Sequence, residues 1–370
     1  MYNKSLIQKS LIFIPIFLMS LGVIMIYSAS SIFAAQKFHD SAYFLKKQIL
    51  FGVWGIICML VIMRIPYGFF KKLAYPFWLG SIGLLTLVLI PGIGTKAGGA
   101  VRWLRFGHIS FQPAEFAKLA VIILLSYSFA KKEHDKINNF SIGVLPHLIL
   151  VIPVCFLIFL QPDFGTAMML IALLFIMFFA VGIPIKYLSL MGAIASSAGA
   201  LLIVCNGYRL ERFLAFIDPW KNSTGTGYHI IQSFLAFGSG GFLGTGLGRG
   251  TQKLFYLPEP HTDFIFSVIG EELGFIGVLF VIALFLTIVI CGIKISIHAY
   301  DRFGTYMALG IIILIGLQTV INMSVAMGLL PIKGTPLPFV SYGGTSLMIN
   351  SIGVGILLSI STQCNFTTRR

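Results

Sequence analysis

Charged side chains are scarce in this chain. Only 10% of its 370 residues are Asp, Glu, Lys or Arg, whereas a soluble protein of this length carries roughly a quarter. Acidic residues are the rarest class, 12 against 26 basic ones, which leaves a net charge of +14. The basic residues form no block of the nucleic-acid-binding type. The composition excludes a soluble domain and argues against a nucleic-acid partner, and the positive charge fits anionic lipid headgroups instead.

Two kinds of binding motif are also absent. The five cysteines, Cys58, Cys155, Cys205, Cys291 and Cys364, form no C-x-x-C pair, so neither a disulfide framework nor a zinc site is indicated. The glycine-rich segment 244–250 lacks the Gly-Lys-Ser/Thr ending of a phosphate-binding Walker loop. No other ATP-binding motif occurs in the sequence, and we expect no nucleotide cofactor.

Long hydrophobic runs take the place of these motifs. Hydrophobic residues make up 57% of the chain, and a membrane-spanning helix takes roughly 20 mostly apolar residues. The segments that satisfy this requirement are 10–32, 46–64, 73–92, 113–130, 141–160, 164–182, 185–205, 264–292, 303–329 and 340–362. We therefore predict an all-α polytopic membrane protein of about ten transmembrane helices, forming one integral membrane domain over residues 1–370.

The distribution of basic residues predicts the orientation. Loops and tails on the side of the N-terminus carry more Lys and Arg than the short loops on the opposite side, so both termini are expected in the cytoplasm. The polar segments rich in Gly and Pro, which look irregular, then fall outside: 93–112, 161–163, 206–263 and 330–339. The largest of them is an extracytoplasmic loop of about 206–263 between helices 7 and 8. Any reaction is expected at this outer face.

Asp263 lies where a polar loop becomes a hydrophobic helix, within His261-Thr262-Asp263-Phe264-Ile265-Phe266. An ionisable group at a membrane boundary is a candidate for function, and a helix N-terminus favours its ionised form. Small and polar residues follow at helical spacing: Ser267, Gly270, Glu271 and Gly274. Asp263 is either a general base that faces an outer cavity or a charge that merely caps the helix, and position alone leaves both open.

Two other carboxylates lie near the same boundary. Glu115 and Lys118 follow Pro113 inside a predicted span, three residues apart, where an ion pair is the cheapest state for both. This pair is either structural or catalytic. Asp163 ends the tight turn Gln161-Pro162-Asp163. It either binds a metal or a substrate hydroxyl or caps the next helix, and we prefer the cap.

The remaining polar segments also belong to the outer side. The long loop contains Arg209 and Arg212, and then the short apolar stretch 228–237, which is typical of an interfacial or re-entrant helix. The glycine-rich segment with Arg249 and Lys253 is either a phosphate cradle or, as we prefer, a tightly packed turn. The proline-rich segment 331–346 predicts a stiff, non-helical start to the last span, beside the same cavity as Asp263.

These segments, in this order, resemble the SEDS family of cell-wall polymerases, which contains RodA, FtsW and SpoVE. The resemblance covers essentially the whole chain. It is carried by Arg102-Trp103, the segment from Phe111 to Lys118, Gln161-Pro162-Asp163, the segment from His261 to Phe266 and the segment from Pro336 to Gly344. Within the family, segments 208–220 and 253–260 are more similar to the division branch, FtsW, than to RodA.

The resemblance implies a peptidoglycan glycosyltransferase that polymerises lipid II, a disaccharide-peptide on undecaprenyl pyrophosphate. Asp263 matches the family's catalytic Asp and is expected to act as the base. The candidates for steadying the departing pyrophosphate are Arg102, Arg209, Arg212 and Lys333. A divalent cation, Mg or Mn, is also expected to assist the reaction, and the sequence does not identify the residues that bind it. Glu115, Lys118 and Asp163 match other functionally sensitive positions.

The resemblance also implies partners and a location. A class B penicillin-binding protein and other division-machinery proteins are the expected partners, in the bacterial cytoplasmic membrane at the division septum. Displacement by a single base predicts inversion at the anomeric carbon. The competing hypotheses are a RodA-type elongation polymerase, a lipid II flippase and a scaffold without activity. Because no internal repeat is apparent in the sequence, the flippase is disfavoured.

Overall fold

The structure, a computed structural model, describes residues 4–97, 100–107, 109–132, 138–223, 225, 227–252 and 260–364. Its elements are α1 (Lys4–Phe38), α2 (Tyr43–Ile62), α3 (Phe69–Leu89), β1 (Gly94–Ala97), β2 (Ala100–Phe106), β3 (Ile109–Phe111), α4 (Pro113–Ala130), η1 (Phe140–Val144), α6 (Leu145–Leu160), α7 (Phe164–Val181), α8 (Ile185–Val204), α9 (Gly207–Ile217), η2 (Pro219–Asn222), α10 (Tyr228–Gly240), α11 (Ile265–Ile297), α12 (Arg302–Ala326) and α13 (Gly344–Thr362). Ten helices among the described residues are long and apolar enough to cross a membrane. The predicted number of spans is confirmed, and the chain is a multi-pass membrane protein.

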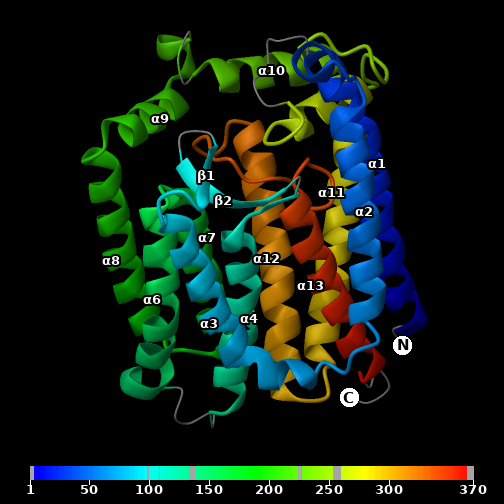
Figure 1. Cartoon of the computed structure of the whole chain (residues 1–370). Coiled ribbons are helices and arrows are strands. Elements are labelled where there is room, and N and C mark those ends of the chain that lie inside the picture. Colours follow the sequence, from blue (N-terminus) through cyan, green and yellow to red (C-terminus); the bar gives the residue numbers. More distant parts are fainter. Residues whose placement is uncertain are drawn as a thin grey trace.

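The helices form a bundle with α4, α12 and α13 at its centre (Figure 1). In the most hydrophobic 18 residues of each of these helices, 78%, 61% and 89% of the residues are buried, against 0% for α8 at the edge. The ends of the described chain lie at one end of the bundle, whereas β1–β3, α9 and α10 lie at the other. We call the second end the sheet end.

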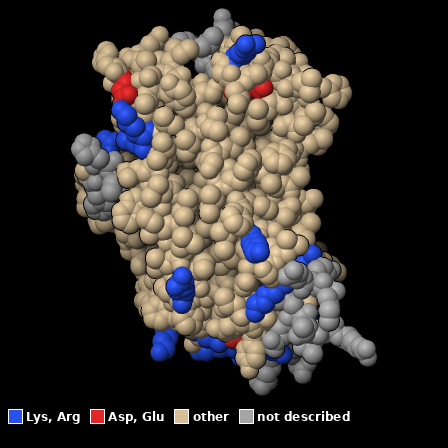
Figure 2. Space-filling view, turned by 90° about the vertical axis from the view of Figure 1, so that its right-hand side faces the viewer, with Lys and Arg blue, Asp and Glu red and all other residues tan. Residues whose placement is uncertain are grey.

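The surface of the bundle has the pattern expected of a protein in lipid. Figure 2 shows one side of the molecule, on which Lys, Arg, Asp and Glu lie toward the two ends and a band between them shows none. Large apolar side chains are exposed on the outer helices, among them Phe13, Trp54 and Phe280. Such exposure would be costly in water, and it is neutral where the neighbours are lipid chains.

The segment 93–112 differs from the sequence-based expectation. It is not irregular but forms an antiparallel sheet in the order β1-β2-β3, with Thr95 opposite Trp103 and Leu104 opposite Phe111. The physical reason lies in β2, because its valine and aromatic residues favour an extended backbone even though the flanking residues include glycines. The sheet packs on α3 and α4 at the sheet end.

The last span begins later than predicted. Residues 331–343 are non-helical and α13 starts at Gly344 rather than near residue 340. Pro336 and Pro338 interrupt the segment, and Phe339 adopts a left-handed backbone with φ of 65°, which is uncommon for a residue with a side chain. The predicted stiff, non-helical start is therefore confirmed, and it extends four residues further into the chain than the expected boundary.

Helix α11 is broken at Gly274, where φ is 67° and ψ is −167°. The glycine-rich loop after α10 supplies the hydrogen bonds that the break removes. Four bonds join the two segments: Thr245 N to Glu271 O (3.0 Å), Gly246 N to Glu272 O (3.0 Å), Phe275 N to Gly241 O (2.9 Å) and Ile276 N to Phe242 O (3.3 Å). A break inside a membrane protein is tolerated because another part of the protein satisfies the freed backbone groups.

The change Gly274→Ala is expected to destabilise the protein by about 1–3 kcal/mol, since the backbone of Gly274 is in a region that almost only glycine adopts. An added Cβ would also meet the backbone of the loop at Leu243 and Gly244. The free energy of unfolding in mixed micelles measures the effect. Gly83→Ala is the matched control, because a Cβ there meets nothing and should stabilise α3 by about 0.5–1 kcal/mol. Equal stability of the two variants would contradict the argument.

Candidate functional site

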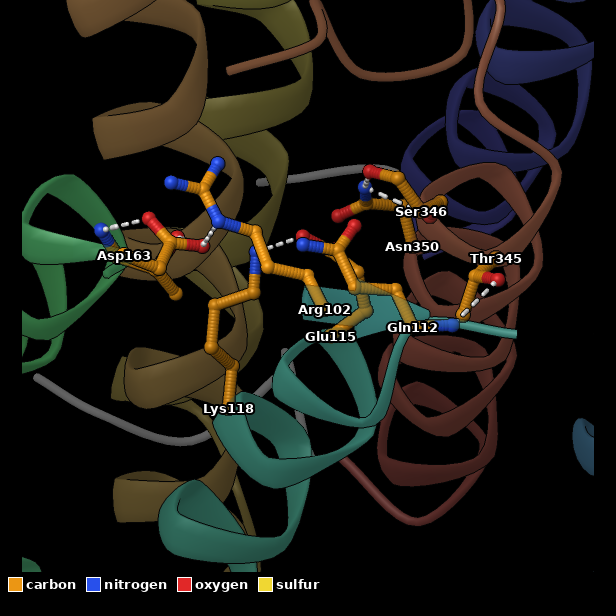
Figure 3. A network of polar contacts seen from close by, with 9 residues as sticks. Arg102, Gln112, Glu115, Lys118, Asp163, Thr345, Ser346 and Asn350 are labelled. Atoms are coloured by element: carbon orange, nitrogen blue, oxygen red, sulfur yellow. Dashed lines mark hydrogen bonds and ion pairs between the residues drawn. The ribbon is translucent and has the colours of Figure 1, made fainter. Parts of the chain in front are cut away.

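Arg102 and Asp163 connect β2 to the start of α7 at the sheet end. Asp163 caps α7, accepting hydrogen bonds from the backbone N (3.1 Å) and Oγ1 (3.0 Å) of Thr166. Arg102 Nε lies 3.9 Å from Asp163 Oδ2, and the guanidinium also donates to the carbonyls of Gln161 and Pro162. The preferred interpretation of Asp163 as a cap is confirmed, and an arginine holds the same turn (Figure 3).

Glu115 and Lys118 form the predicted ion pair inside α4. The two charged atoms are 2.6 Å apart, and the side chains are only 5% and 1% exposed. Gln112 is the residue before the helix and Pro113 takes the first helical position, which its missing N–H and fixed φ suit. The second carboxylate oxygen of Glu115 is buried without a hydrogen-bond partner among the described residues. The pair lies close to Arg102 and Asp163 in Figure 3.

Lys333 reaches the same cluster from the non-helical segment before α13. Its aliphatic carbons occupy the space that a Cβ on Gly165, two residues after Asp163, would fill. Burial lowers the pKa of Lys333, Asp163 and Glu115 oppose the shift and Lys118 adds to it, and the resulting value is about 8. With Arg102, the site contains three basic groups and two carboxylates. We call Arg102, Glu115, Lys118, Asp163 and Lys333 the charged cluster.

Asp263 adjoins the charged cluster through its neighbour Gly334. A Cβ on Gly334 would lie 3.0 Å from Asp263 Oδ2, so the carboxylate rests against the residue that follows Lys333. Asn322 of α12 donates to the carbonyls of Asp263 (2.9 Å) and Thr335 (2.7 Å) and ties the two segments together. Asp263 precedes the N-cap residue of α11, Phe264. Segment 331–346 therefore lies beside Asp263, and that the two line one cavity stays a prediction.

The small polar face that follows Asp263 packs against α10. The hydroxyls of Ser267 and Ser233 are 2.6 Å apart, and a Cβ on Gly270 would meet the ring of Phe237. The short apolar stretch predicted as an interfacial or re-entrant helix is α10, which lies across the sheet end of the bundle (Figure 1). This face therefore positions the first half of α11.

The glycine-rich loop is a packed turn in the described part of the chain. Glu271 Oε1 accepts the backbone N–H groups of Thr251 (2.6 Å) and Gln252 (3.1 Å), and Glu272 Oε2 accepts that of Gly248 (3.0 Å). Two carboxylates therefore already accept the backbone N–H groups that a phosphate would need. This agrees with the interpretation of the loop as a tightly packed turn. Lys253 and the rest of segment 253–259 lie outside the described residues.

Arg209 and Arg212 flank the charged cluster from α9. The guanidinium of Arg209 lies over the rings of Phe159 (5.0 Å) and Phe164 (4.9 Å), on either side of the turn that holds Asp163. Arg212 Nη1 lies 3.5 Å from the carbonyl oxygen of Ile332, next to Lys333. The structure therefore gathers all eight site residues predicted from the sequence at one end of the bundle.

Sequence reasoning missed two residues that position Asp263. Asn322 is buried in a span of mostly apolar residues, and a buried amide in a membrane helix is a signal that could have revealed it. The ring of His261 lies against those of Phe44 (4.4 Å) and Tyr342 (5.8 Å), and its carbonyl accepts the Tyr342 N–H (2.9 Å). Burial and, less strongly, Lys37 lower the pKa of His261 to about 4. His261 is therefore a neutral anchor at pH 7.

The described residues contain no group of three or more His, Cys, Asp or Glu side chains that could hold a metal ion together. The carboxylate of Asp263 lies against Gly334, in the segment that carries Lys333. A magnesium ion commonly uses one or two carboxylates with substrate phosphates. The single carboxylate of Asp263 is enough for a magnesium ion bound in this way. A site in which protein groups alone surround the ion is not present among the described residues.

Comparisons with known proteins agree with this geometry. The profile of the FtsW/RodA/SpoVE family, described as "Cell cycle protein", matches residues 8–365. The chain is 48% identical to a "Probable peptidoglycan glycosyltransferase FtsW" of Geobacter sp. strain M18, covering 92% of this chain and 93% of the relative. It is 41% identical to "Stage V sporulation protein E" of Bacillus subtilis, covering 96% and 97%.

Two solved structures have the same fold. One, from work on "polymerization and crosslinking by a peptidoglycan synthase complex", is 29% identical with a TM-score of 0.78, covering 95% of this chain and 96% of that one. The other, the "Rod shape determining protein RodA" of Thermus thermophilus, is 27% identical with a TM-score of 0.70 and covers 95% of each chain.

Proposed function

The chain belongs to the family of FtsW, RodA and SpoVE and is a peptidoglycan glycosyltransferase of the FtsW type; we propose that it polymerises lipid II at the sheet end. We further propose that the sheet end faces outward from the bacterial cytoplasmic membrane, with both chain termini in the cytoplasm, and that the product serves the division septum. The observation that carries the proposal is the position of Asp263, whose carboxylate lies against Gly334 next to the charged cluster.

In the proposed reaction Asp263 acts as the base. Its carboxylate takes the proton of the attacking sugar hydroxyl of the acceptor as that oxygen bonds to the anomeric carbon of the donor. The bond from this carbon to the pyrophosphate breaks, and the electron pair leaves with the pyrophosphate. One displacement on the face opposite the leaving group inverts the anomeric carbon, from the α-linked carrier to a β-linked glycan.

The charged cluster supports departure of the pyrophosphate. Lys333 and Arg102 are the two basic groups closest to solvent, and Lys118 lies deeper, paired with Glu115. Fixed positive charge at the position where negative charge develops lowers the barrier without reorganisation of the protein. Arg212 borders the segment of Lys333 and Arg209 borders that of Asp163, so both extend the positive charge outward. A divalent cation would supply counter-charge to the pyrophosphate, with Asp263 as its protein ligand.

The comparisons support a partner as well. One similar chain comes from a peptidoglycan synthase complex that polymerises and crosslinks. We propose that this chain likewise works with a class B penicillin-binding protein, which would crosslink the new strands, and with other proteins of the division machinery. Activity assays of this chain therefore include the partner.

The decisive assay is conversion of labelled lipid II by the purified protein with its cognate penicillin-binding protein, in proteoliposomes with Mg²⁺. Glycan chains are the expected product. Transbilayer movement of lipid II without polymer would favour a flippase, although a charged cluster beside β2 at the sheet end fits alternating access poorly. Rescue of a strain that lacks its elongation polymerase, and not of one that lacks its division polymerase, would favour the RodA-type role.

Polymerisation is expected to fall as the pH rises through about 8, because burial lowers the pKa of Lys333 to that value and the neutral amine no longer steadies pyrophosphate. The variant Lys333→Arg should keep its rate to higher pH, since Arg stays charged. Initial rates across this range measure both. Folding stability should move the opposite way, rising between pH of about 8 and 10.5, the ordinary pKa of a lysine. A wild-type profile that stays flat above pH 8 would contradict this role.

A further inference from the structure

Strand β2 separates two positively charged regions of the sheet end. Side chains alternate between the faces of a strand, so Arg102 lies on one face and Trp103 and Arg105 lie on the other. Arg102 points to Asp163 and the charged cluster. Trp103 and Arg105 line a separate cavity of about 260 Å³ between the sheet and the starts of α2 and α13. We call it the β2–α13 cavity.

The β2–α13 cavity is basic. Lys47, Lys96 and Arg105 line it, and none of the residues that line it is acidic. The ammonium of Lys47 donates to the Tyr43 hydroxyl (2.7 Å) and lies 4.4 Å from the centre of that ring, so its contacts are with a neutral group. Lys96 and Arg105 are exposed. An anion entering the cavity would meet positive charge that no lining carboxylate neutralises.

The N-terminus of α13 opens into the same cavity. Gly343 and Gly344 line it, and the first helical hydrogen bond is from Leu347 N to Gly343 O (2.9 Å). No side chain caps this 19-residue helix, so its first amides and its dipole favour an anion there. A Cβ on Gly344 would overlap the ring of Phe51, which explains the glycine at this approach.

Asp263 lies between the two positive regions. Thr262 lines the β2–α13 cavity, whereas the carboxylate of the next residue, Asp263, rests against Gly334 beside Lys333. Two basic regions therefore flank the residue proposed as the base. A polymerase that joins two lipid-linked sugars has two pyrophosphates to accommodate, of which only the donor's departs. The departing pyrophosphate must lie near the reacting carbon, and therefore near Asp263. Lys333 is the basic residue whose segment contacts Asp263, so the departing pyrophosphate belongs on its side.

We propose that the β2–α13 cavity binds the pyrophosphate of the acceptor substrate, the one that is not cleaved, while the charged cluster serves the donor. This inference rests on the proposed function, because it assumes two polyprenyl-pyrophosphate substrates. Lys47, Lys96, Arg105 and the amides at the start of α13 hold the phosphates. The indole of Trp103 and the ring of Phe51 line the apolar side of the cavity, beside which the first isoprene units or the adjoining sugar lie.

The test compares the double variant Lys96→Ala/Arg105→Ala with Lys46→Ala/Lys221→Ala. The control removes the same two charges from exposed surface ion pairs with Asp40 and Asp218, which contribute little to stability. In steady-state polymerisation with the cognate partner, the cavity variant should raise KM for lipid II about tenfold or more while kcat changes less than about twofold. The control should match the wild type. An unchanged KM in the cavity variant would overturn the proposal.

A binding experiment separates this inference from the proposed function. Undecaprenyl pyrophosphate, titrated into the protein–partner complex in nanodiscs, should saturate two sites per chain in the wild type and in Asp263→Asn, and one in the cavity variant. Two sites in the cavity variant would overturn the inference even if polymerisation proceeds. If the wild-type protein binds two molecules but makes no polymer, the proposed function is contradicted while the anion site is still supported.

A third arm identifies which anion the cavity recognises. The stem peptide of lipid II also carries carboxylates, so a soluble disaccharide-pentapeptide without pyrophosphate serves as the probe. The cavity variant should bind it as the wild type does. If the variant loses this probe and still binds two molecules of undecaprenyl pyrophosphate, the cavity recognises peptide carboxylates and the pyrophosphate assignment is wrong.

Discussion

Replacing Asp263 by Asn should lower the rate of glycan polymerisation by about 10²–10⁴-fold, the usual contribution of a general base. The change preserves the shape of the side chain and removes its negative charge, and with it the ability to take a proton. The backbone contact with Asn322 involves the carbonyl of residue 263 and is kept, so the loop should remain in place. The measurement is the initial rate of polymer formation from labelled lipid II with the cognate partner.

The matched control for this variant is Asp218→Asn. Asp218 also lies at the sheet end, between α9 and η2, but it pairs with the exposed Lys221 (3.2 Å), away from the charged cluster. It should polymerise at the wild-type rate, and both variants should co-purify with the partner. Equal polymer from wild type and Asp263→Asn would show that Asp263 is not the base. No polymer from the wild type with its partner, and no movement of lipid II, would revive the scaffold hypothesis.

The second large effect is expected at the ion pair of α4. Lys118→Met should destabilise the protein by about 3–5 kcal/mol, because it leaves the carboxylate of Glu115 buried without its partner. Glu115→Gln has the same effect, because it leaves the ammonium of Lys118 buried without its partner. The double variant Glu115→Gln/Lys118→Met should recover most of this loss, since no unpaired charge remains. Unfolding free energies of the four proteins in mixed micelles give the coupling between the two residues.

Activity of the double variant then separates the structural role from the catalytic one. If the pair only stabilises α4, the double variant should polymerise normally once it is folded. If Lys118 also steadies the pyrophosphate, the double variant should be stable and slow. Single variants as stable as the wild type would contradict the burial of the pair. The comparison matters because loss of activity in the single variants alone would fit both roles.

The parts of this structure that follow local rules were predictable from the sequence. Ten spans followed from apolar runs of sufficient length. The pair Glu115–Lys118 followed from helical spacing, because residues three apart share one face. The cap at Asp163 followed from its position before a helix. Each of these depends on residues close together in the chain, so the pattern contains the information.

The parts that depend on distant contacts were not predictable. The break at Gly274 depends on bonds from a loop some thirty residues earlier. The contact of Lys333 with Gly165, like that of Arg102 with Asp163, joins segments that are far apart in the sequence. The sheet β1–β3 consists of short strands that lie beside glycines typical of loops. The β2–α13 cavity combines four such segments, so its basic residues look like ordinary surface lysines and arginines in the sequence.

The break in α11 also affects how the protein is made. The loop that bonds to it, residues 241–246, precedes the break in the chain and therefore leaves the ribosome first. When the broken helix enters the bilayer, the groups that satisfy its free amides and carbonyls have already been synthesised. A circular permutant that placed this loop after α11 would insert a helix with unsatisfied backbone at membrane depth, which is costly. The order of the two segments in the gene thus protects the insertion of the helix that follows Asp263.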